Sequence, residues 1–381
     1  MRVLHLGFED PRMPGAGGGS VRTHEINRRL AAEGFHITVL TTRYPGWKER
    51  VQDGVHYVPI GIGTGKNRMT RLLAYVIRLP FEVQKRRGTT DLVVEDFFAP
   101  FSTMAAPLWT RRPTIGVVQW LNAKDKARQY KLPLYWIERW GVRKHHRLIT
   151  VSHGIAERLS AQNPTAHVDV IGNGVDPEAW NPQPHLGHDV LFIGRLEYSD
   201  KGLDLLLQAW ARSSQHLTAN LLIAGTGPDE AKIRTTIHTL GLTDRVHMLG
   251  WLSGPKKFQA LSDARLVIVP SRNETFGLVA IDALATGTPV IAFNIPCLRE
   301  IIPTGAGWLV EPFDTNALAE EITRRYLQPG LEEDSVLRRQ FAARYNWDAL
   351  ARMQARSYQD SLAALGNSTA RLQVNNQGDR G

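Results

Sequence analysis

Two cations, Arg195 and Lys201, stand in the segment 194–202, which follows a short apolar run typical of a β-strand. A helix is predicted to begin near Leu203, so both side chains would lie beside its N-terminus. Two fixed cations at the positive end of a helix can bind a diphosphate and stabilise it as a leaving group. Solvated surface charges are the alternative interpretation of this segment taken alone.

Two carboxylates, Glu274 and Asp282, are separated by about two helical turns, and the helix between them is predicted to begin near Phe276. Gly277 and Leu278 would offer backbone amides to a phosphate at the N-terminus of that helix. A carboxylate that accepts two hydrogen bonds suits sugar or ribose hydroxyls. By themselves, however, two acids at this spacing are more often part of a solvated helix face.

A glycine-rich stretch at 14–20 lies between the first predicted strand and a helix that opens at Arg22. Glycines let backbone amides approach an anion closely, and a helix N-terminus adds partial positive charge. A dinucleotide-binding fingerprint fits poorly, because Ser20 stands where its third glycine is needed and the second strand ends without an acidic residue. NAD binding is therefore disfavoured, and a flexible surface loop remains the alternative.

These motifs are set among strand-like runs that alternate with helical patterns. In the first half, strands are predicted at 3–7, 36–41, 91–95, 114–118 and 148–151, with a helix at 22–32. In the second half, strands are predicted at 189–193, 220–224, 246–249, 266–269 and 289–293, with helices at 203–213, 229–240 and 276–286. This alternation is typical of parallel, doubly wound sheets. The sequence therefore predicts an α/β protein of two Rossmann-like domains, with ligands bound in a central cleft that the carboxyl ends of their strands face.

The length of 381 residues suits two domains of about 150–200 residues each. Pro177, Pro182 and Pro184 mark a linker. The predicted limits are 1–176 for the first domain, 177–188 for the linker and 189–365 for the second domain, whose last helix is free to pack back on the first. Residues 366–381 are polar and are predicted to be a disordered tail.

Charge and cysteine content restrict partners and compartment. The formal net charge of +9 indicates acidic partners, namely phosphates or an anionic membrane face. Nucleic acid is not expected, because no zinc-finger spacing or RNA-recognition signature is present. Cys297 is the single cysteine and cannot form an internal disulfide, which fits a reducing cytoplasm. No signal peptide and no run of eighteen apolar residues is found. We therefore expect a cytoplasmic protein, which could also associate with the inner face of the membrane.

The motifs together resemble the retaining family 4 glycosyltransferases of GT-B fold, also called glycosyl transferases group 1. Shared features are the glycine-rich loop, the Gly-Arg-Leu…Lys-Gly segment at 194–202 and an acidic pair like the family's E-x7-E motif. Further matches are the Asn-Gly-Val-Asp segment at 173–176 and the segments 224–228, 249–251 and 285–290. The resemblance covers about residues 1–365. It implies a hexosyltransferase, of the EC 2.4 class, that uses a nucleotide-sugar donor and needs no metal or other cofactor.

The resemblance also implies roles for individual residues. Arg195 and Lys201 would hold the donor diphosphate, Glu274 would contact the transferred sugar, and Asp282 would contact the ribose, although it is one methylene shorter than the family's glutamate. The residues expected to bind the donor are Gly18, Gly19, Arg195, Lys201, Trp251, Leu252, Glu274, Phe276, Gly277, Leu278, Val279 and Asp282. UDP is the first expectation for the nucleotide, with GDP, ADP or dTDP as alternatives.

The first domain departs from the family pattern at Gln119, which occupies the position of a common histidine. Glutamine cannot exchange protons but can donate a hydrogen bond, so Gln119 is expected to assist catalysis beside Arg195, Lys201 and Glu274. Glu95 or Asp96 could instead act as a base, although a structural role at a strand end is the commoner reading. Residues expected on the acceptor side are His24, Glu95, Asp96, Asn122 and Asn173.

The sequence does not identify the acceptor: a glycan, a lipid-linked glycan and a small molecule are all compatible with it. A basic amphipathic segment at 65–87 could lie on an anionic membrane. A core helix with solvated charges is the alternative, and Pro80 is predicted to interrupt the helix. Competing functions are a nucleotide-sugar 2-epimerase of the same fold, a non-catalytic nucleotide- or sugar-binding subunit and, less favoured, a dinucleotide oxidoreductase.

Overall fold

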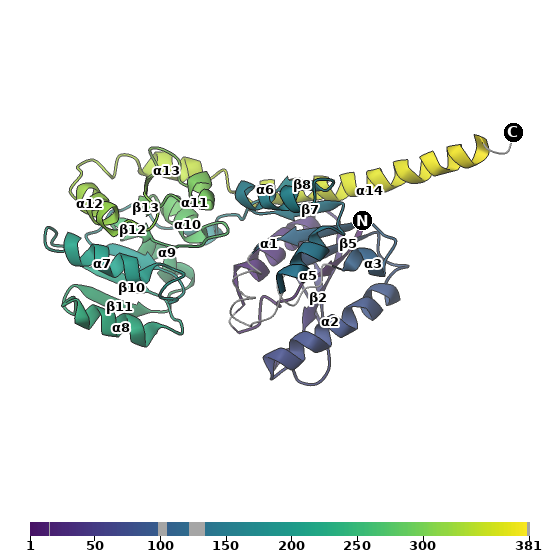
Figure 1. Ribbon diagram of the computed structural model, residues 1–381, viewed down its shortest axis with the longest axis horizontal. Coiled ribbons are helices and arrows are strands. Elements are labelled where there is room, and N and C mark those ends of the chain that lie inside the picture. Colours follow the sequence, from purple (N-terminus) through teal and green to yellow (C-terminus); the bar gives the residue numbers. More distant parts are fainter. Residues whose placement is uncertain (15, 98–104, 122–133, 379–381) are drawn as a thin grey trace. The chain divides into compact units, whose positions relative to one another are not determined.

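The computed structural model describes residues 1–14, 16–97, 105–121 and 134–378. It separates into two compact units (Figure 1): Met1–Asn173 with Trp347–Gly381, and Gly174–Asn346. The chain thus leaves the first unit after Asn173, slightly before the expected limit at 176, and the segment 177–188 belongs to the second unit rather than standing apart. It returns to the first unit at Trp347.

The first unit contains one sheet of eight strands. They are β1 (Arg2–Leu6), β2 (His36–Thr42), β3 (Arg50–Gln52), β4 (Val55–Ile60), β5 (Leu92–Phe97), β6 (Thr114–Val118), β7 (Arg147–Thr150) and β8 (His167–Val170). Their order is β3-β4-β2-β1-β5-β6-β7-β8, and every pair is parallel except β3 with β4. The strand order reverses beside β1, whose neighbours are β2 and β5. A crevice for ligands forms at such a reversal, outside the carboxyl ends of the strands.

Helices cover both faces of this sheet. They are α1 (Gly18–Ala32), α2 (Arg68–Lys85), α3 (Ala106–Trp109), α5 (Leu134–Val142), α6 (His153–Gln162) and α14 (Trp347–Gly378). Successive strand residues point to opposite faces, so Val3 packs in one apolar cluster with residues of α1 and α14, and Leu4 in another with residues of α2 and α3. The first unit therefore needs the chain's last helix to cover one side of its sheet.

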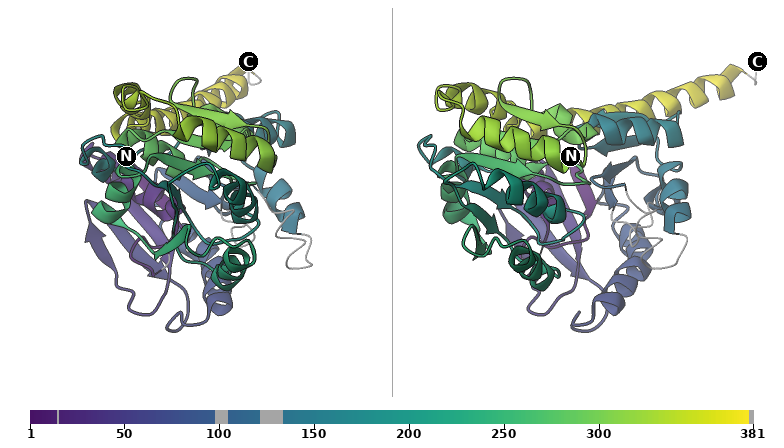
Figure 2. Two further views of the ribbon diagram at one scale, coloured as in Figure 1. Left: turned by 90° about the vertical axis from the view of Figure 1, so that its left-hand side faces the viewer. Right: turned by 60° about the vertical axis from the view of Figure 1, so that its left-hand side comes forward.

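Two expectations about helices are corrected. α2 continues through Pro80 instead of ending there. Proline costs one backbone hydrogen bond, and the burial of Leu79 and Val83 on either side compensates for that loss. α14 continues to Gly378, where a disordered tail was expected, and Figure 2 shows it as one helix that ends close to the C-terminus. Residues 370–373 are alanine, arginine, leucine and glutamine, which favour a helix, and 366–378 contain no proline.

The second unit contains a six-stranded parallel sheet. Its strands are β9 (Val190–Ile193), β10 (Leu221–Ala224), β11 (Val246–Gly250), β12 (Leu266–Val269), β13 (Val290–Phe293) and β14 (Gly307–Val310), in the order β11-β10-β9-β12-β13-β14. Its helices are η1 (Pro177–Trp180), α7 (Leu203–Ser213), α8 (Glu230–Thr239), α9 (Gly254–Ser262), α10 (Leu278–Thr286), α11 (Pro296–Ile301), α12 (Thr315–Tyr326) and α13 (Ser335–Ala342). β9 lies between β10 and β12, so the strand order reverses there and the loops after β9 and β12 meet at one edge.

Candidate active site

The loop after β9, residues 194–202, is the cation loop, because it carries both predicted cations. The Arg195 side chain is 67% exposed, and its Nε lies 3.1 Å from Glu197 Oε1. Lys201 is more enclosed, and its Nζ donates a 2.6 Å hydrogen bond to Glu274 Oε1 in the loop after β12. The strand order thus brings together two residues that are 73 positions apart.

The Lys201–Glu274 ion pair has a defined electrostatic setting. Burial acts to lower the pKa of the Lys201 ammonium, but the neighbouring carboxylates, Glu274 foremost, more than offset it and the pKa is raised. Ser271 Oγ donates to the same Glu274 oxygen at 2.9 Å. Lys201 is therefore a fixed cation at neutral pH, held beside the carboxylate expected to contact the sugar.

Glycines allow the loops at this edge to touch through their backbones. Gly202 has φ of +68°, and a Cβ there would lie 1.8 Å from the Pro270 carbonyl oxygen. A Cβ on Gly225, after β10, would lie 1.8 Å from the Gly194 carbonyl oxygen. A side chain at either position would overlap a backbone carbonyl oxygen. Glycine at 202 and 225 therefore allows the cation loop to lie in backbone contact with the loops after β12 and β10.

The N-terminus of α10 provides the backbone amides that the sequence analysis expected. Gly277 caps it with φ of +94°, and the first amides of the helix, including those of Leu278 and Val279, have no partner within the helix. Such amides bind anions. The side chain of Phe276 is buried, and its ring packs edge-on against Tyr345. Only the backbone of Phe276 is thus placed to meet a donor.

Asp282 lies inside the unit rather than on an open helix face. It is buried in α10, and Lys257 of α9 donates a 2.6 Å hydrogen bond to its Oδ2. Burial raises the pKa of Asp282, although Lys257 acts to lower it. Sequence reasoning missed Lys257, because a lysine on a helix face gives no signal of its buried partner.

Trp251 is 67% exposed, and Leu252 is half-buried, in the loop between β11 and α9.

In the first unit, the glycine-rich loop and Gln119 come together. Gly18 and Gly19 open α1, and Gln119 Nε2 donates to the Gly19 carbonyl oxygen at 3.4 Å. Gly17 N donates to Glu9 Oε2 at 3.0 Å, which fixes the loop after β1. Gln119 thus lies against the start of α1, at the carboxyl end of β6.

Glu95 and Asp96 have structural partners at the end of β5. Glu95 is buried and its Oε2 accepts a hydrogen bond from Ala106 N at 2.9 Å. Asp96 accepts hydrogen bonds from His5 Nε2 at 2.9 Å and Thr23 Oγ1 at 2.8 Å. Burial acts to raise the pKa of Asp96, but His5, Thr23 and Arg22 outweigh it, so the pKa is lowered. A general base works best with a pKa near the operating pH, and this environment disfavours Asp96 in that role.

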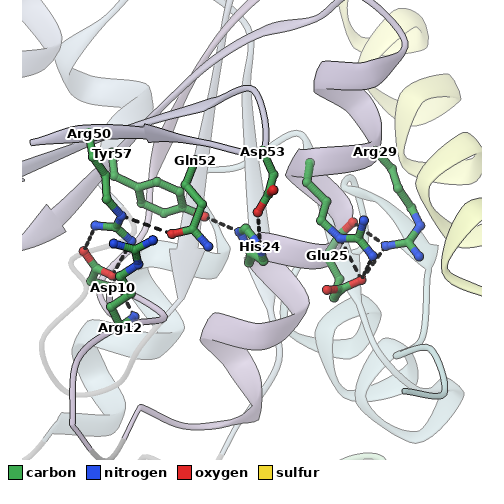
Figure 3. A network of polar contacts seen from close by, with 10 residues as sticks. Asp10, Arg12, His24, Glu25, Arg29, Arg50, Gln52, Asp53 and Tyr57 are labelled. Carbon is green, nitrogen blue, oxygen red and sulfur yellow. Dashed lines mark hydrogen bonds and ion pairs between the residues drawn. The ribbon is translucent and has the colours of Figure 1, made fainter. Parts of the chain in front are cut away.

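His24 belongs to a polar network on α1 and the β3–β4 hairpin (Figure 3). Its Nδ1 lies 2.8 Å from the Tyr57 hydroxyl and its Nε2 lies 3.2 Å from Asp53 Oδ2. Burial lowers the pKa of His24. In the same network, Arg50 makes two hydrogen bonds to the buried Asp10, at 2.7 and 2.8 Å. The side chain of His24 therefore braces the hairpin in this structure.

The other predicted residues are placed as follows. Asn173 is buried at the end of the first unit's main segment. Asn122 lies outside the described residues. Within the described part of the chain, no three His, Cys, Asp or Glu side chains are grouped so that they could hold a metal ion.

Comparison with known proteins identifies both halves of the chain. Residues 16–179 match the family Glycosyltransferase Family 4, and residues 181–341 match Glycosyl transferases group 1. An uncharacterised glycosyltransferase of Methanocaldococcus jannaschii is 29% identical over 58% of this chain and 61% of its own length. A glycogen synthase of Mycobacterium tuberculosis is 26% identical over 94% of both chains. A phosphatidyl-myo-inositol mannosyltransferase of Mycobacterium leprae is 32% identical over 52% of this chain and 54% of its own.

Solved structures agree on the fold. Sucrose-phosphate synthase from Thermosynechococcus elongatus superimposes with a TM-score of 0.76 at 22% identity, over 95% of this chain and 99% of that one. The Anabaena protein HepE, in complex with UDP, gives a TM-score of 0.73 at 17% identity, over 94% of this chain and 100% of that one. At these identities the likeness concerns the fold alone.

Proposed function

This chain belongs to the family 4 glycosyltransferases of GT-B fold, and we propose that it moves a sugar from a nucleoside-diphosphate sugar to an acceptor with retention of the anomeric configuration. The observation that carries the proposal is the Lys201–Glu274 pair, which joins a cation for the diphosphate and a carboxylate for the sugar at 2.6 Å. Arg195 and the N-terminal amides of α10 belong to the same unit and add positive charge for an anion.

The proposed reaction exchanges one bond at the anomeric carbon. The acceptor oxygen forms a bond to that carbon while the bond to the diphosphate oxygen breaks on the same face of the sugar. Arg195 and Lys201 stabilise the charge that develops on the diphosphate. The acceptor proton passes to the departing diphosphate. Gln119 cannot take a proton, and the lowered pKa of Asp96 disfavours a base there.

UDP is our first proposal for the nucleotide, with GDP, ADP or dTDP as alternatives. The HepE complex shows that a protein of this fold holds UDP. We propose further that the two cations replace a divalent metal at the diphosphate. A chelator should then leave turnover unchanged, and loss of turnover that returns with added Mg²⁺ would contradict this part of the proposal.

A thermal-shift screen against UDP, GDP, ADP, dTDP and NADH tests the donor proposal. A ligand present at a hundred times its Kd adds about 2.7 kcal/mol of stability. We expect one nucleoside diphosphate to raise Tm and NADH to leave it unchanged. The matching sugar nucleotides then serve as substrates, and analysis of the products by NMR separates transfer with retention from inversion or 2-epimerisation.

Lys201→Ala should lower turnover of that donor by orders of magnitude, because a preorganised charge at the leaving group supplies several kcal/mol to the transition state. Arg234→Ala is a suitable control, since Arg234 forms an exposed pair with Glu230 within α8. Near-normal turnover by the Lys201 variant would remove the proposed role of this cation.

We propose that the acceptor, a glycan, a lipid-linked glycan or a small molecule, binds the first unit, and that this unit associates with anionic membranes through α2. Leu73, Ile77 and Phe81 recur every fourth residue of that helix and are 54%, 61% and 68% exposed. Arg78 and Lys85 are exposed on the same helix. An apolar stripe flanked by cations suits an interfacial helix. Within the described residues, no helix is long and apolar enough to cross a membrane.

Co-sedimentation with vesicles tests this association. The protein should bind vesicles that contain phosphatidylglycerol and should bind phosphatidylcholine alone less well. Ile77→Ser with Phe81→Ser should reduce binding by about tenfold. Leu240→Ser, which changes an exposed leucine of the second unit, is the control. Equal binding by both variants would contradict the role of α2 and leave the proposed transfer reaction unaffected.

A further inference from the structure

Arg272 belongs to the Glu274 loop, residues 270–277 after β12, and its side chain reaches the loop that carries Lys201. Its Nη1 donates to the Ser199 carbonyl oxygen at 2.5 Å. Nη1 and Nη2 also bond the two carboxylate oxygens of Asp204, each at 2.7 Å. Asp204 is in the first turn of α7, directly after the cation loop. One guanidinium thus contacts both ends of the turn that contains Lys201.

The backbone beside Arg272 adds to this connection. Arg272 N donates to the Asp200 carbonyl oxygen at 3.0 Å, and Asn273 Nδ2 donates to Asp200 Oδ1 at 3.0 Å. These bonds flank Lys201 on one loop and Glu274 on the other. Since both loops are irregular segments beyond strand ends, the sheet hydrogen bonds do not fix their separation.

We propose that Arg272 and Asp204 form a clamp that holds the cation loop against the Glu274 loop, and that Arg272 is a positioning residue for Lys201. The role of Lys201 at the diphosphate rests on the proposed function. The clamp itself concerns only the geometry of the two loops. An arginine is suited to it, because its planar fork binds a carboxylate through two parallel hydrogen bonds and still reaches a carbonyl oxygen. A lysine offers a point charge and cannot make this set of contacts.

The clamp predicts non-additive effects on ligand binding. UDP, or whichever nucleoside diphosphate the screen selects, is titrated by calorimetry into the wild type, Arg272→Met, Lys201→Ala and the double variant. Arg272→Met should weaken binding by about tenfold in the wild-type background and by less than about twofold when Lys201 is already alanine. Arg272→Lys should restore only part of the lost affinity. Equal losses in both backgrounds would show that Arg272 acts independently of Lys201 and would overturn the proposal.

Hydrogen exchange of the ligand-free protein tests the clamp without any nucleotide. Arg272→Met and Asp204→Asn should each speed amide exchange in 199–204 and 271–274, while exchange of β12 stays as in the wild type. Arg234→Met is the matched control, because it removes another arginine–carboxylate pair of this unit, at 2.8 Å, that lies outside both loops. Unchanged exchange in both loops would overturn the clamp. If the wild type binds no nucleoside diphosphate, the proposed function fails, and the exchange experiment still decides on the clamp.

Discussion

Lys201 and Glu274 neutralise each other in the ligand-free protein. A donor bound as proposed would have to compete with this pair. In the proposed function, the Lys201 cation would bind the diphosphate of a nucleotide without its sugar, while the Glu274 carboxylate lies 2.6 Å from Nζ. A donor that carries a sugar offers hydroxyls to that carboxylate. At the residue scale, we therefore expect the pair to favour the intact donor over the product nucleotide.

Glu274→Gln should separate these two effects. Loss of the negative charge should tighten binding of the free nucleoside diphosphate by about threefold to tenfold. Turnover of the nucleotide sugar should fall in the same variant, because the neutral glutamine oxygen accepts weaker hydrogen bonds from sugar hydroxyls than a carboxylate does. Calorimetry and initial rates measure the two quantities. Weaker binding of the nucleotide would show that Glu274 does not oppose the diphosphate. Glu230→Gln, which removes an acid paired with Arg234 within α8, is the control.

Cys297 lies close to this pair, and its Sγ donates to the Glu274 carbonyl oxygen at 3.1 Å. Burial raises the pKa of its thiol to about 12, and the nearby carboxylates act in the same direction. At pH 8 the thiolate would be about one part in ten thousand, so alkylation by iodoacetamide should be very slow in the native protein and fast after unfolding. Rapid alkylation of the native protein, followed by mass spectrometry, would contradict this environment.

At the scale of elements, the turn before α7 depends on Gly202. Gly202→Ala adds a Cβ at a positive φ, which costs about 1–2 kcal/mol, and also places it on the Pro270 carbonyl oxygen. Gly241 has nearly the same φ, +67°, with nothing near its Cβ position. Gly202→Ala should therefore lower the free energy of unfolding by at least about 1 kcal/mol more than Gly241→Ala does. Urea denaturation measures both, and equal losses would mean that the two loops are not in backbone contact.

At the scale of the whole molecule, the first unit is built from two separated stretches of chain. α14 contributes Trp347 and Tyr358 to the apolar cluster on the α1 face of the sheet. Gln354 Oε1 accepts a 3.0 Å hydrogen bond from the buried Arg22 of α1. Burial lowers the pKa of Arg22, which indicates how costly its charge would be without partners.

Truncation after Asn346 should unfold the first unit. Losing two buried aromatic residues costs about 3–5 kcal/mol each, which approaches the whole stability of an ordinary domain. Hydrogen exchange should show β1 and α1 losing protection while β9 and β12 keep it. A chain that ends at Ala364 retains every contact just described and is the control. Protected β1 amides in the shorter chain would contradict this role of α14.

Much of the fold could be predicted because its signals are local. The apolar runs at 36–41, 114–118 and 266–269 coincide with strands to within one residue, since alternation and β-branched residues act on a few neighbouring positions. The helix at 203–213 has the predicted limits. The short strands β3, β8 and β14 were missed, because three or four residues carry too little pattern to distinguish a strand from a loop. The six-residue β4, which contains Pro59, was missed as well.

The order of apolar runs along the chain also predicts which residues lie after strand ends, and hence that Arg195, Lys201 and Glu274 belong to one edge of one sheet. Which of these side chains pair could be seen only once the chain was folded. The contacts of Lys201 with Glu274, of Arg272 with Asp204 and of Arg22 with Gln354 span 73, 68 and 332 positions. Such pairs depend on strand order and on the direction of each side chain, which no local pattern encodes. The burial of Asp282 beside Lys257 and the passage of α2 through Pro80 follow from the same long-range packing.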